Sequence, residues 1–165
     1  KLPSSKSPEY PNGRSGIGIV LTDNVAVTTS RKIDVDPGKI GGPSGGLMFT
    51  LQIYDQLIGD KLAKDRNISG TGTMNADGYV GEIGGIDKKI IAAKEAGSTI
   101  FFAPYIAPNK EILKYEEQHK TNYQLARDTG KKYAPNMKII PVRTFQDAVN
   151  YLENGTVIKT TDKAQ

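Results

Sequence analysis

A single serine, Ser44, lies between two pairs of glycines, where an extended segment gives way to a helical pattern. Pro43 suits the first turn of a helix, because proline lacks the N–H group that this position does not need. We therefore expect a helix to begin at the serine, so that free N–H groups and the positive end of the helix dipole surround its hydroxyl. Such a serine is a candidate nucleophile. The candidate oxyanion and substrate-binding residues are Gly41, Gly42 and Gly45.

The same stretch has two other interpretations. A serine near the start of a helix is often only a cap, in which case the chain would be a noncatalytic binding module. A glycine-rich loop that opens a helix also favours anions, as in a small-molecule kinase-like phosphate-binding domain. Acidic residues at a metal-binding spacing, which such a kinase would need, are missing from the sequence.

A nucleophilic serine needs a base, and His119 is the single histidine of the chain. Residues 42–46 fit the Gly-x-Ser-x-Gly pattern of α/β-hydrolases, in which the histidine follows the serine. The chain is short for that fold, however, and His119 lies in a charged segment typical of a solvated helix. The triad is therefore the weaker of the two options for the base.

Lysine is the other candidate base, since serine–lysine pairs perform the same chemistry. In a helix expected over residues 86–96, Ile86 and Ile90 fall on one apolar stripe, Lys89 lies at the flank of that stripe, and Lys88 points away. Burial disfavours the charged form of an amine, and a neutral amine can accept a proton. A lysine at a helix edge can also extend its amine into water, so the helix alone leaves both interpretations open.

Composition restricts the class of protein. A chain of 165 residues is the usual size of one domain. The net charge of +4 is mild and the basic residues are dispersed, so we expect no nucleic-acid partner. The chain has no cysteine, which excludes disulfides and thiol catalysis, and we expect neither a metal nor a cofactor. It contains no apolar run long enough to span a membrane and no signal-peptide pattern.

The pattern along the chain predicts three segments: a linker or remnant of a preceding domain over residues 1–15, a globular domain over 16–154 and a C-terminal tail over 155–165. Within the globular domain, strands and helices alternate. Strands are expected over residues 16–21, 25–35, 67–74, 79–83, 99–103 and 137–142. Helices are expected over residues 43–58, 86–96 and 144–154, with two short helices within 108–132. Thr144 and Asp147 have the spacing of a capping box for the last of these helices, and Asp77-Gly78 predicts a hairpin turn.

Two motifs in register resemble the proteolytic domain of Lon-type proteases. Residues 42–47, Gly-Pro-Ser-Gly-Gly-Leu, resemble the nucleophile motif Gly-Pro-Ser-Ala-Gly of that family. Residues 83–93 resemble its lysine motif Ile-Gly-Gly-Leu-Lys-Glu-Lys, whose final lysine matches Lys89. The separation of 45 positions between Ser44 and Lys89 is close to the one that the family shows. The resemblance covers roughly residues 16–152 and implies an α+β fold, with small mixed sheets packed with helices in a single domain.

The resemblance implies an ATP-independent serine endopeptidase with a Ser-Lys dyad and no cofactor. Its catalytic residues would be Ser44, Lys89 and Thr71, the last within Gly-Thr-Gly-Thr, where the family has a threonine that hydrogen-bonds the lysine amine. The likeness is greatest to the secreted or membrane-anchored peptidases of Gram-positive bacteria that couple a Lon-like domain to a PDZ domain, including streptococcal peptidases that process peptide pheromones. It thus implies an exported or extracellular peptide substrate, a pheromone precursor among the candidates, and a location at the extracellular face of the membrane. A PDZ domain and a transmembrane anchor are expected in the full-length protein, and a homo-oligomer is left open.

Two positions depart from the family pattern. Lon enzymes usually have an acidic residue three positions before the serine, where this chain has Gly41, and Gly45 replaces the alanine of the motif. The first departure bears on contacts to the substrate strand or on activation. The chain also contains no Gly-x-x-x-x-Gly-Lys-[Ser/Thr] motif, so ATP-driven unfolding is not expected within it.

Overall fold

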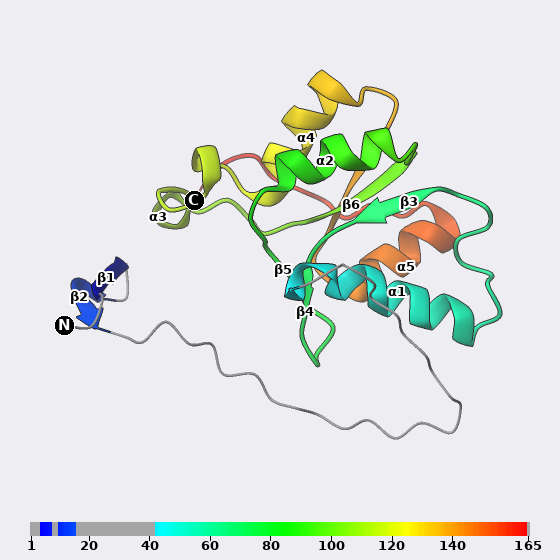
Figure 1. Ribbon diagram of the computed structural model, residues 1–165, viewed down its shortest axis with the longest axis horizontal. Helices are drawn as coiled ribbons and strands as arrows, with labels where there is room; N and C mark the ends of the chain where they lie inside the picture. Colours follow the sequence, from blue (N-terminus) through cyan, green and yellow to red (C-terminus); the bar gives the residue numbers. More distant parts are fainter. Residues whose placement is uncertain (1–3, 8–9, 16–41, 165) are drawn as a thin grey trace. The chain divides into compact units, whose positions relative to one another are not determined.

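A computed structural model of the chain describes residues 4–7, 10–15 and 42–164 (Figure 1). The chain divides into two units, Lys1–Ile33 and Asp34–Gln165. In the first unit, β1 (Ser4–Ser7) and β2 (Tyr10–Ser15) pair as an antiparallel hairpin inside the segment predicted to be a linker or a remnant of a preceding domain. The predicted domain boundaries remain predictions. The strands predicted over residues 16–21 and 25–35 lie outside the described residues.

In the second unit, three described strands form a parallel sheet in the order β3-β6-β7. These strands are β3 (Ile68–Gly70), β6 (Ile100–Pro104) and β7 (Lys138–Val142). Parallel neighbours need a crossover, and helices α2 (Ile86–Glu95) and α4 (Asn122–Tyr133) lie in the two crossovers. A separate antiparallel hairpin joins β4 (Thr73–Met74) to β5 (Val80–Gly81). Small sheets packed with helices confirm the predicted fold class.

The parallel sheet is the middle layer of this unit, and successive side chains of β6 point to opposite faces. Phe101 packs against α2 and α4, whereas Phe102 packs against α1 (Gly46–Leu57) and α5 (Phe145–Asn154). Figure 1 shows these two pairs of helices on either side of the sheet. Both phenylalanines are fully buried, and each such burial contributes about 2 kcal/mol relative to exposure. The helices that carry the candidate nucleophile and the candidate base therefore cover opposite faces of one sheet.

The helix predicted to start at Ser44 begins instead as a 3-10 turn over Pro43–Gly45, and the α-helix proper starts at Gly46. The final helix has the predicted capping box, in which Thr144 and Asp147 each bond the other's backbone N–H. The predicted hairpin turn before Tyr79 is also present, with Gly78 at φ +83°. Glycine adopts this left-handed conformation without steric cost.

The polar segment over residues 108–132 differs from the two short helices predicted. It forms a single turn of helix, α3 (Lys110–Leu113), then a 3-10 turn over Glu117–His119, and then the 12-residue helix α4. A capping box formed by Thr121 and Gln124 fixes the start of α4, and Leu125 and Ala126 bury one face of the helix. Among the described residues, no helix is both long and apolar enough to cross a membrane.

The C-terminal segment, predicted as a tail, has no regular secondary structure over residues 155–164. Side chains of the domain nevertheless bind it at three points. Arg127 donates two hydrogen bonds to Asp162 at 2.9 Å, Tyr105 Oη accepts one from Thr161 N, and Arg143 donates one to Lys159 O. The segment therefore lies against the globular domain, because its backbone and its one aspartate find partners there.

Candidate active site

The turn that carries Ser44 is attached to the connection between β3 and β4. The carbonyl oxygen of Ser44 accepts hydrogen bonds from Gly72 N and from Thr71 Oγ1, both at 2.9 Å. One residue into α1, Leu47 N donates to Gly72 O at 3.1 Å. These three bonds fix the backbone beneath the Ser44 hydroxyl to the central sheet, because Thr71 N in turn donates to Phe102 O of β6.

Gly72 has to be a glycine for this attachment to form. Its φ is +147°, and a Cβ atom at this position would lie 2.4 Å from Val80 Cγ1. Gly46 is under a similar constraint, since its Cβ would lie 2.9 Å from Met74 N. The absence of two side chains therefore lets the start of α1 approach the β4–β5 hairpin closely.

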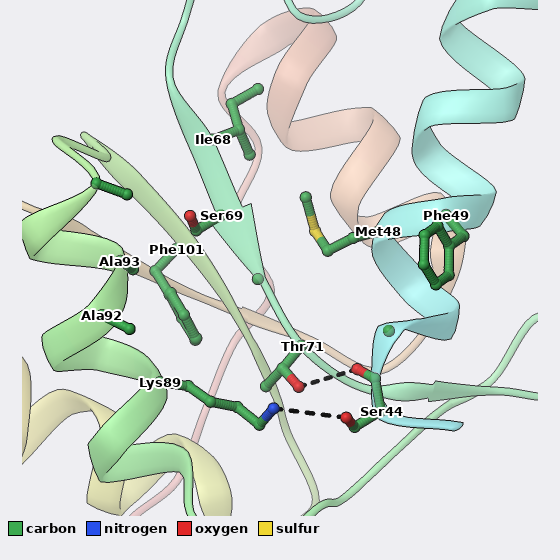
Figure 2. Close-up of a pocket in the computed structure, with 13 residues that line it drawn as sticks. Ser44, Met48, Phe49, Ile68, Ser69, Thr71, Lys89, Ala92, Ala93 and Phe101 are labelled. Carbon is green, nitrogen blue, oxygen red and sulfur yellow. Dashed lines mark hydrogen bonds between the residues drawn. The ribbon is translucent and has the colours of Figure 1, made fainter. Parts of the chain in front are cut away.

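Lys89 reaches Ser44 from the other side of the cavity. It lies in the first turn of α2 and, as the helical spacing predicts, its side chain is half-buried whereas Lys88 is exposed. Figure 2 shows the amine pointing at the serine, with Lys89 Nζ 3.5 Å from Ser44 Oγ. This distance is the upper limit of a hydrogen bond, and such catalytic contacts are often long without substrate. The pair can therefore pass a proton from hydroxyl to amine.

Thr71 occupies a different place from the one that the resemblance implies. Its hydroxyl donates to the backbone of Ser44 and forms no hydrogen bond with the Lys89 amine (Figure 2). The side chain is 1% exposed, so its hydroxyl needs a partner in the interior. Thr71 therefore holds the serine turn and makes no direct contact of this kind with the lysine.

The candidate oxyanion residues have different positions. Gly45 lines the cavity beside Ser44. Gly42 precedes the 3-10 turn, with φ +82° and an exposed backbone. Because the first N–H groups of a helical turn have no partner within the helix, this end of the turn can offer donors to an anion. Gly41 lies outside the described residues.

Ser44 and Lys89 sit at one end of a cavity of about 460 Å³ between α1, β3 and α2 (Figure 2). Its wall is mostly apolar or small. The other lining residues are Gly45, Met48, Phe49, Ile68, Ser69, Gly70, Thr71, Ala92, Ala93, Ala96 and Phe101. An extended chain whose backbone passes Ser44 could place an apolar side chain here. This wall was not predicted from the sequence, although Met48 follows Ser44, and Ala92, Ala93 and Ala96 follow Lys89, at helical spacings.

A polar cluster lies beside the start of α2. It was also not predicted from the sequence. Glu82 Oε1 accepts a hydrogen bond from Asn122 N at 2.8 Å. Burial raises the pKa of the Glu82 carboxyl from 4.5 to about 7; the hydrogen bond from Asn122 opposes this rise and the charge of Glu116 adds to it. The side chain of Asn122 binds the backbone of Ile83, the residue that follows Glu82.

His119, the alternative base, is exposed and does not line the cavity. Its Nδ1 lies 3.1 Å from Leu113 O, within its own surface segment. The structure therefore brings the lysine, and not the histidine, to the serine. Among the described residues, no group of three or more histidine, aspartate or glutamate side chains is arranged to hold a metal ion.

Comparison with known proteins points in the same direction as this geometry. The family model of the Lon protease (S16) C-terminal proteolytic domain matches residues 24–150. The chain is 30% identical over 111 residues to Lon protease 2 of Bacillus subtilis (strain 168), covering 67% of this chain and 16% of that protein. It is 29% identical over 126 residues to Lon protease of Metamycoplasma arthritidis (strain 158L3-1), covering 75% of this chain and 13% of that protein. The aligned segment is thus a small part of either relative.

Proposed function

Because this chain belongs to the Lon protease C-terminal proteolytic domain family, we propose that it is an ATP-independent serine endopeptidase with Ser44 as nucleophile and Lys89 as general base. The observation that carries the proposal is the 3.5 Å separation of Lys89 Nζ and Ser44 Oγ at the end of an apolar cavity. Nucleophile and base within reach of each other are the minimum that acyl transfer requires.

In the first half of the reaction, neutral Lys89 takes the proton of the Ser44 hydroxyl while Oγ attacks the peptide carbonyl carbon. N–H groups around Gly42 and Gly45 stabilise the oxyanion, at about 3 kcal/mol for each donor. Lys89 then gives its proton to the departing amine, and an acyl-enzyme ester remains on Ser44. In the second half, Lys89 takes a proton from water, the hydroxide attacks the ester, and the proton returns to Ser44 as the acid product leaves.

Thr71 has a positioning role in this proposal. Its bond to the Ser44 carbonyl, together with that from Gly72 N, keeps the serine turn in one place while charge develops on the substrate. Positioning of this kind matters because misplacing a reacting group by about 1 Å can cost about 100-fold in rate.

The cavity beside the dyad leads us to propose an apolar substrate side chain next to the bond that is cleaved. The wall formed by Met48, Phe49 and Phe101 favours such a side chain by the hydrophobic effect.

Following the resemblance, we further propose that the substrate is an exported or extracellular peptide, with a peptide pheromone precursor among the candidates, and that the domain works at the extracellular face of the membrane. A PDZ domain and a transmembrane anchor in the full-length protein belong to the same proposal.

The test is cleavage of a library of quenched fluorescent peptides by Ser44→Ala and His119→Ala variants. We expect Ser44→Ala to lose all turnover, and to resist labelling by a fluorophosphonate that labels the unaltered protein. His119→Ala should keep nearly all of its activity, because the histidine lies outside the cavity. Loss of activity in the His119 variant with its fold intact would overturn the dyad. Absence of both turnover and labelling in the unaltered protein would instead favour a noncatalytic module.

A further inference from the structure

The helix that carries Lys89 begins at a turn with no cap of its own. Its N-cap is Gly85, which has φ +68° and no side chain to accept from the first N–H groups of the helix. Gly84 precedes it, so two residues of high backbone freedom stand in succession. Lys89 N donates to Gly85 O at 3.3 Å. Groups outside the helix must therefore hold this turn, in addition to the packing of Ile86 and Ile90 in the core.

The side chain of Asn122 binds the backbone just before this turn, at Ile83. Its Oδ1 accepts from Ile83 N at 2.8 Å, and its Nδ2 donates to Ile83 O at 2.9 Å. The amide thus satisfies both backbone groups of one residue, as a neighbouring strand would. Glu82 Oε1 accepts from Asn122 N at 2.8 Å, so the two segments are joined by three hydrogen bonds. Glu117 adds a weaker contact, in which its carboxylate accepts from Gly85 N at 3.2 Å.

The amide of Asn122 is itself well fixed. Asn122 is 5% exposed and is the first residue of α4, between Thr121 and Gln124 of the capping box. Helix α4 packs along α2 through one apolar cluster, in which Leu125 and Ala126 are buried with residues of α2 (Figure 1). Asn122 therefore transmits the rigidity of α4 to the glycine turn.

We propose that Asn122 is a positioning residue for the Lys89–Ser44 pair: by holding Ile83, its amide fixes the origin of α2 and with it the distance from Lys89 Nζ to Ser44 Oγ. This inference rests on the proposed dyad. The 3.5 Å separation is already at the upper limit of a hydrogen bond. A shift of the turn by about 1 Å would thus uncouple the base from the nucleophile, at a cost of about 100-fold in rate.

The charges around the amide explain why a neutral side chain suits this position. Glu82 faces Asn122 from the β5–α2 connection, and Glu116 and Glu117 lie in the segment before α4. An ionised aspartate at position 122 would be repelled by these carboxylates and would lack the N–H donor for Ile83 O. Protonation of that aspartate would restore the donor.

The experiment compares Asn122→Ala and Asn122→Asp with Asn109→Ala, by peptide turnover and thermal unfolding. Asn109 is a matched control, because its exposed side chain caps the short helix α3 and does not line the cavity. We expect kcat of Asn122→Ala to fall by about 10- to 100-fold, with KM within about twofold because the cavity wall is unchanged. Asn109→Ala should match the unaltered protein in both constants. If Asn122→Ala does not fold, the isosteric aspartate variant carries the test.

The pH dependence tests whether the bond donated to Ile83 O is the interaction that matters. The rate of Asn122→Asp relative to the unaltered protein should rise as pH falls from 8 to 6, because a protonated carboxyl regains the bond to Ile83 O. A ratio that stays constant, or a kcat of Asn122→Ala equal to that of Asn109→Ala, would overturn the inference. Ser44→Ala is measured in parallel. Turnover by that variant would refute the proposed dyad itself, which is a different result from an unaffected Asn122 variant alongside an inactive serine variant.

Discussion

Lys88 and Lys89 are neighbours in the sequence, yet the helix gives them different environments. Lys88 points into solvent, where an ammonium ion is fully hydrated. Lys89 is half-buried, beside the cavity and within reach of the serine. Only the second lysine can exchange a proton with the Ser44 hydroxyl. One step of 100° around α2 therefore decides which of the two lysines can act as the base.

Substituting arginine for each of these lysines tests this distinction. Arginine remains protonated in proteins and cannot accept a proton, so we expect Lys89→Arg to reduce kcat by at least about 1,000-fold, which is the scale of losing an activated nucleophile. Lys88→Arg should leave kcat within about twofold. Initial rates on one peptide, with circular dichroism as a check of the fold, decide the matter. An active and folded Lys89→Arg protein would refute the assignment.

Glu82 supplies a prediction about stability and pH. Its folded-state pKa of about 7 lies above the ordinary value of 4.5, so the folded protein binds this proton more tightly than the unfolded chain. The resulting stabilisation is fully present below pH 4.5 and is lost as pH rises through 7. Glu82→Gln cannot ionise and keeps an oxygen that accepts from Asn122 N. The variant should therefore be more stable than the unaltered protein at pH 8.5 and equal to it at pH 4.

The expected gap is on the order of 1 kcal/mol. A pKa shift from 4.5 to about 7 corresponds to at most about 3 kcal/mol, and solvent screening reduces this because Glu82 is only partly buried. Urea unfolding of both proteins at several pH values measures the difference. If the difference in unfolding free energy between the two proteins does not change with pH, the Glu82 carboxyl has the same pKa in the folded protein and in the unfolded chain.

Among the helices and strands, local patterns predicted both the strands of the parallel sheet and the helix that carries Lys89. The stripe of Ile86 and Ile90 was enough to place α2 and the flank on which Lys89 lies. The last helix was predicted by its capping box, since Thr144 and Asp147 interact within one turn. These signals are local, and local interactions can be read from spacing alone.

Apart from the Ser44–Lys89 pair, which the resemblance implied, contacts between distant segments were not predicted. Asn122 and Ile83 are 39 positions apart, and their pairing depends on how α4 packs on α2. The Thr71 hydroxyl is a second case, since the resemblance implied a bond to the lysine amine and the structure pairs the hydroxyl with the Ser44 carbonyl. The cavity likewise exists only once three elements are assembled. Such features follow from packing, which no single stretch of sequence encodes.

The cavity wall on α2 predicts which substrates are cleaved. Ala92 lines the cavity and is exposed, so a larger side chain there fills space without disturbing the core. We expect Ala92→Phe to lower kcat/KM by about 10- to 100-fold for peptides with leucine or phenylalanine before the cleaved bond. Peptides with alanine at that position should be affected little, because a small side chain still fits.

Ile91→Phe is the matched control for this prediction. Ile91 is an exposed residue of the same helix and does not line the cavity. Its variant should cleave both kinds of peptide as the unaltered protein does. If Ala92→Phe lowers kcat/KM equally for peptides with large and with small side chains, the cavity does not receive the substrate side chain.

The aligned part of the chain covers 16% of one and 13% of the other of the two relatives that bear the name Lon protease. The chain contains no phosphate-binding loop of the Gly-x-x-x-x-Gly-Lys-[Ser/Thr] type. Under the proposed ATP-independent function, a protein cleaved by this chain alone has to expose an extended segment to the cavity by itself. Spontaneous opening of a folded substrate is rare when its stability is 5–15 kcal/mol, roughly the range for native domains.

The folded and unfolded forms of one substrate should therefore be cleaved at very different rates. We expect a destabilised, unfolded variant of a small domain to be cleaved at a rate similar to that of free peptides. The folded parent should be cleaved at least about 1,000-fold more slowly, because the fraction of open molecules falls about tenfold for each 1.4 kcal/mol of stability. Mass spectrometry of the products over time, with and without ATP, measures both rates. The ATP should make no difference, and rapid degradation of the folded parent by this chain would show that the site does not require an extended substrate.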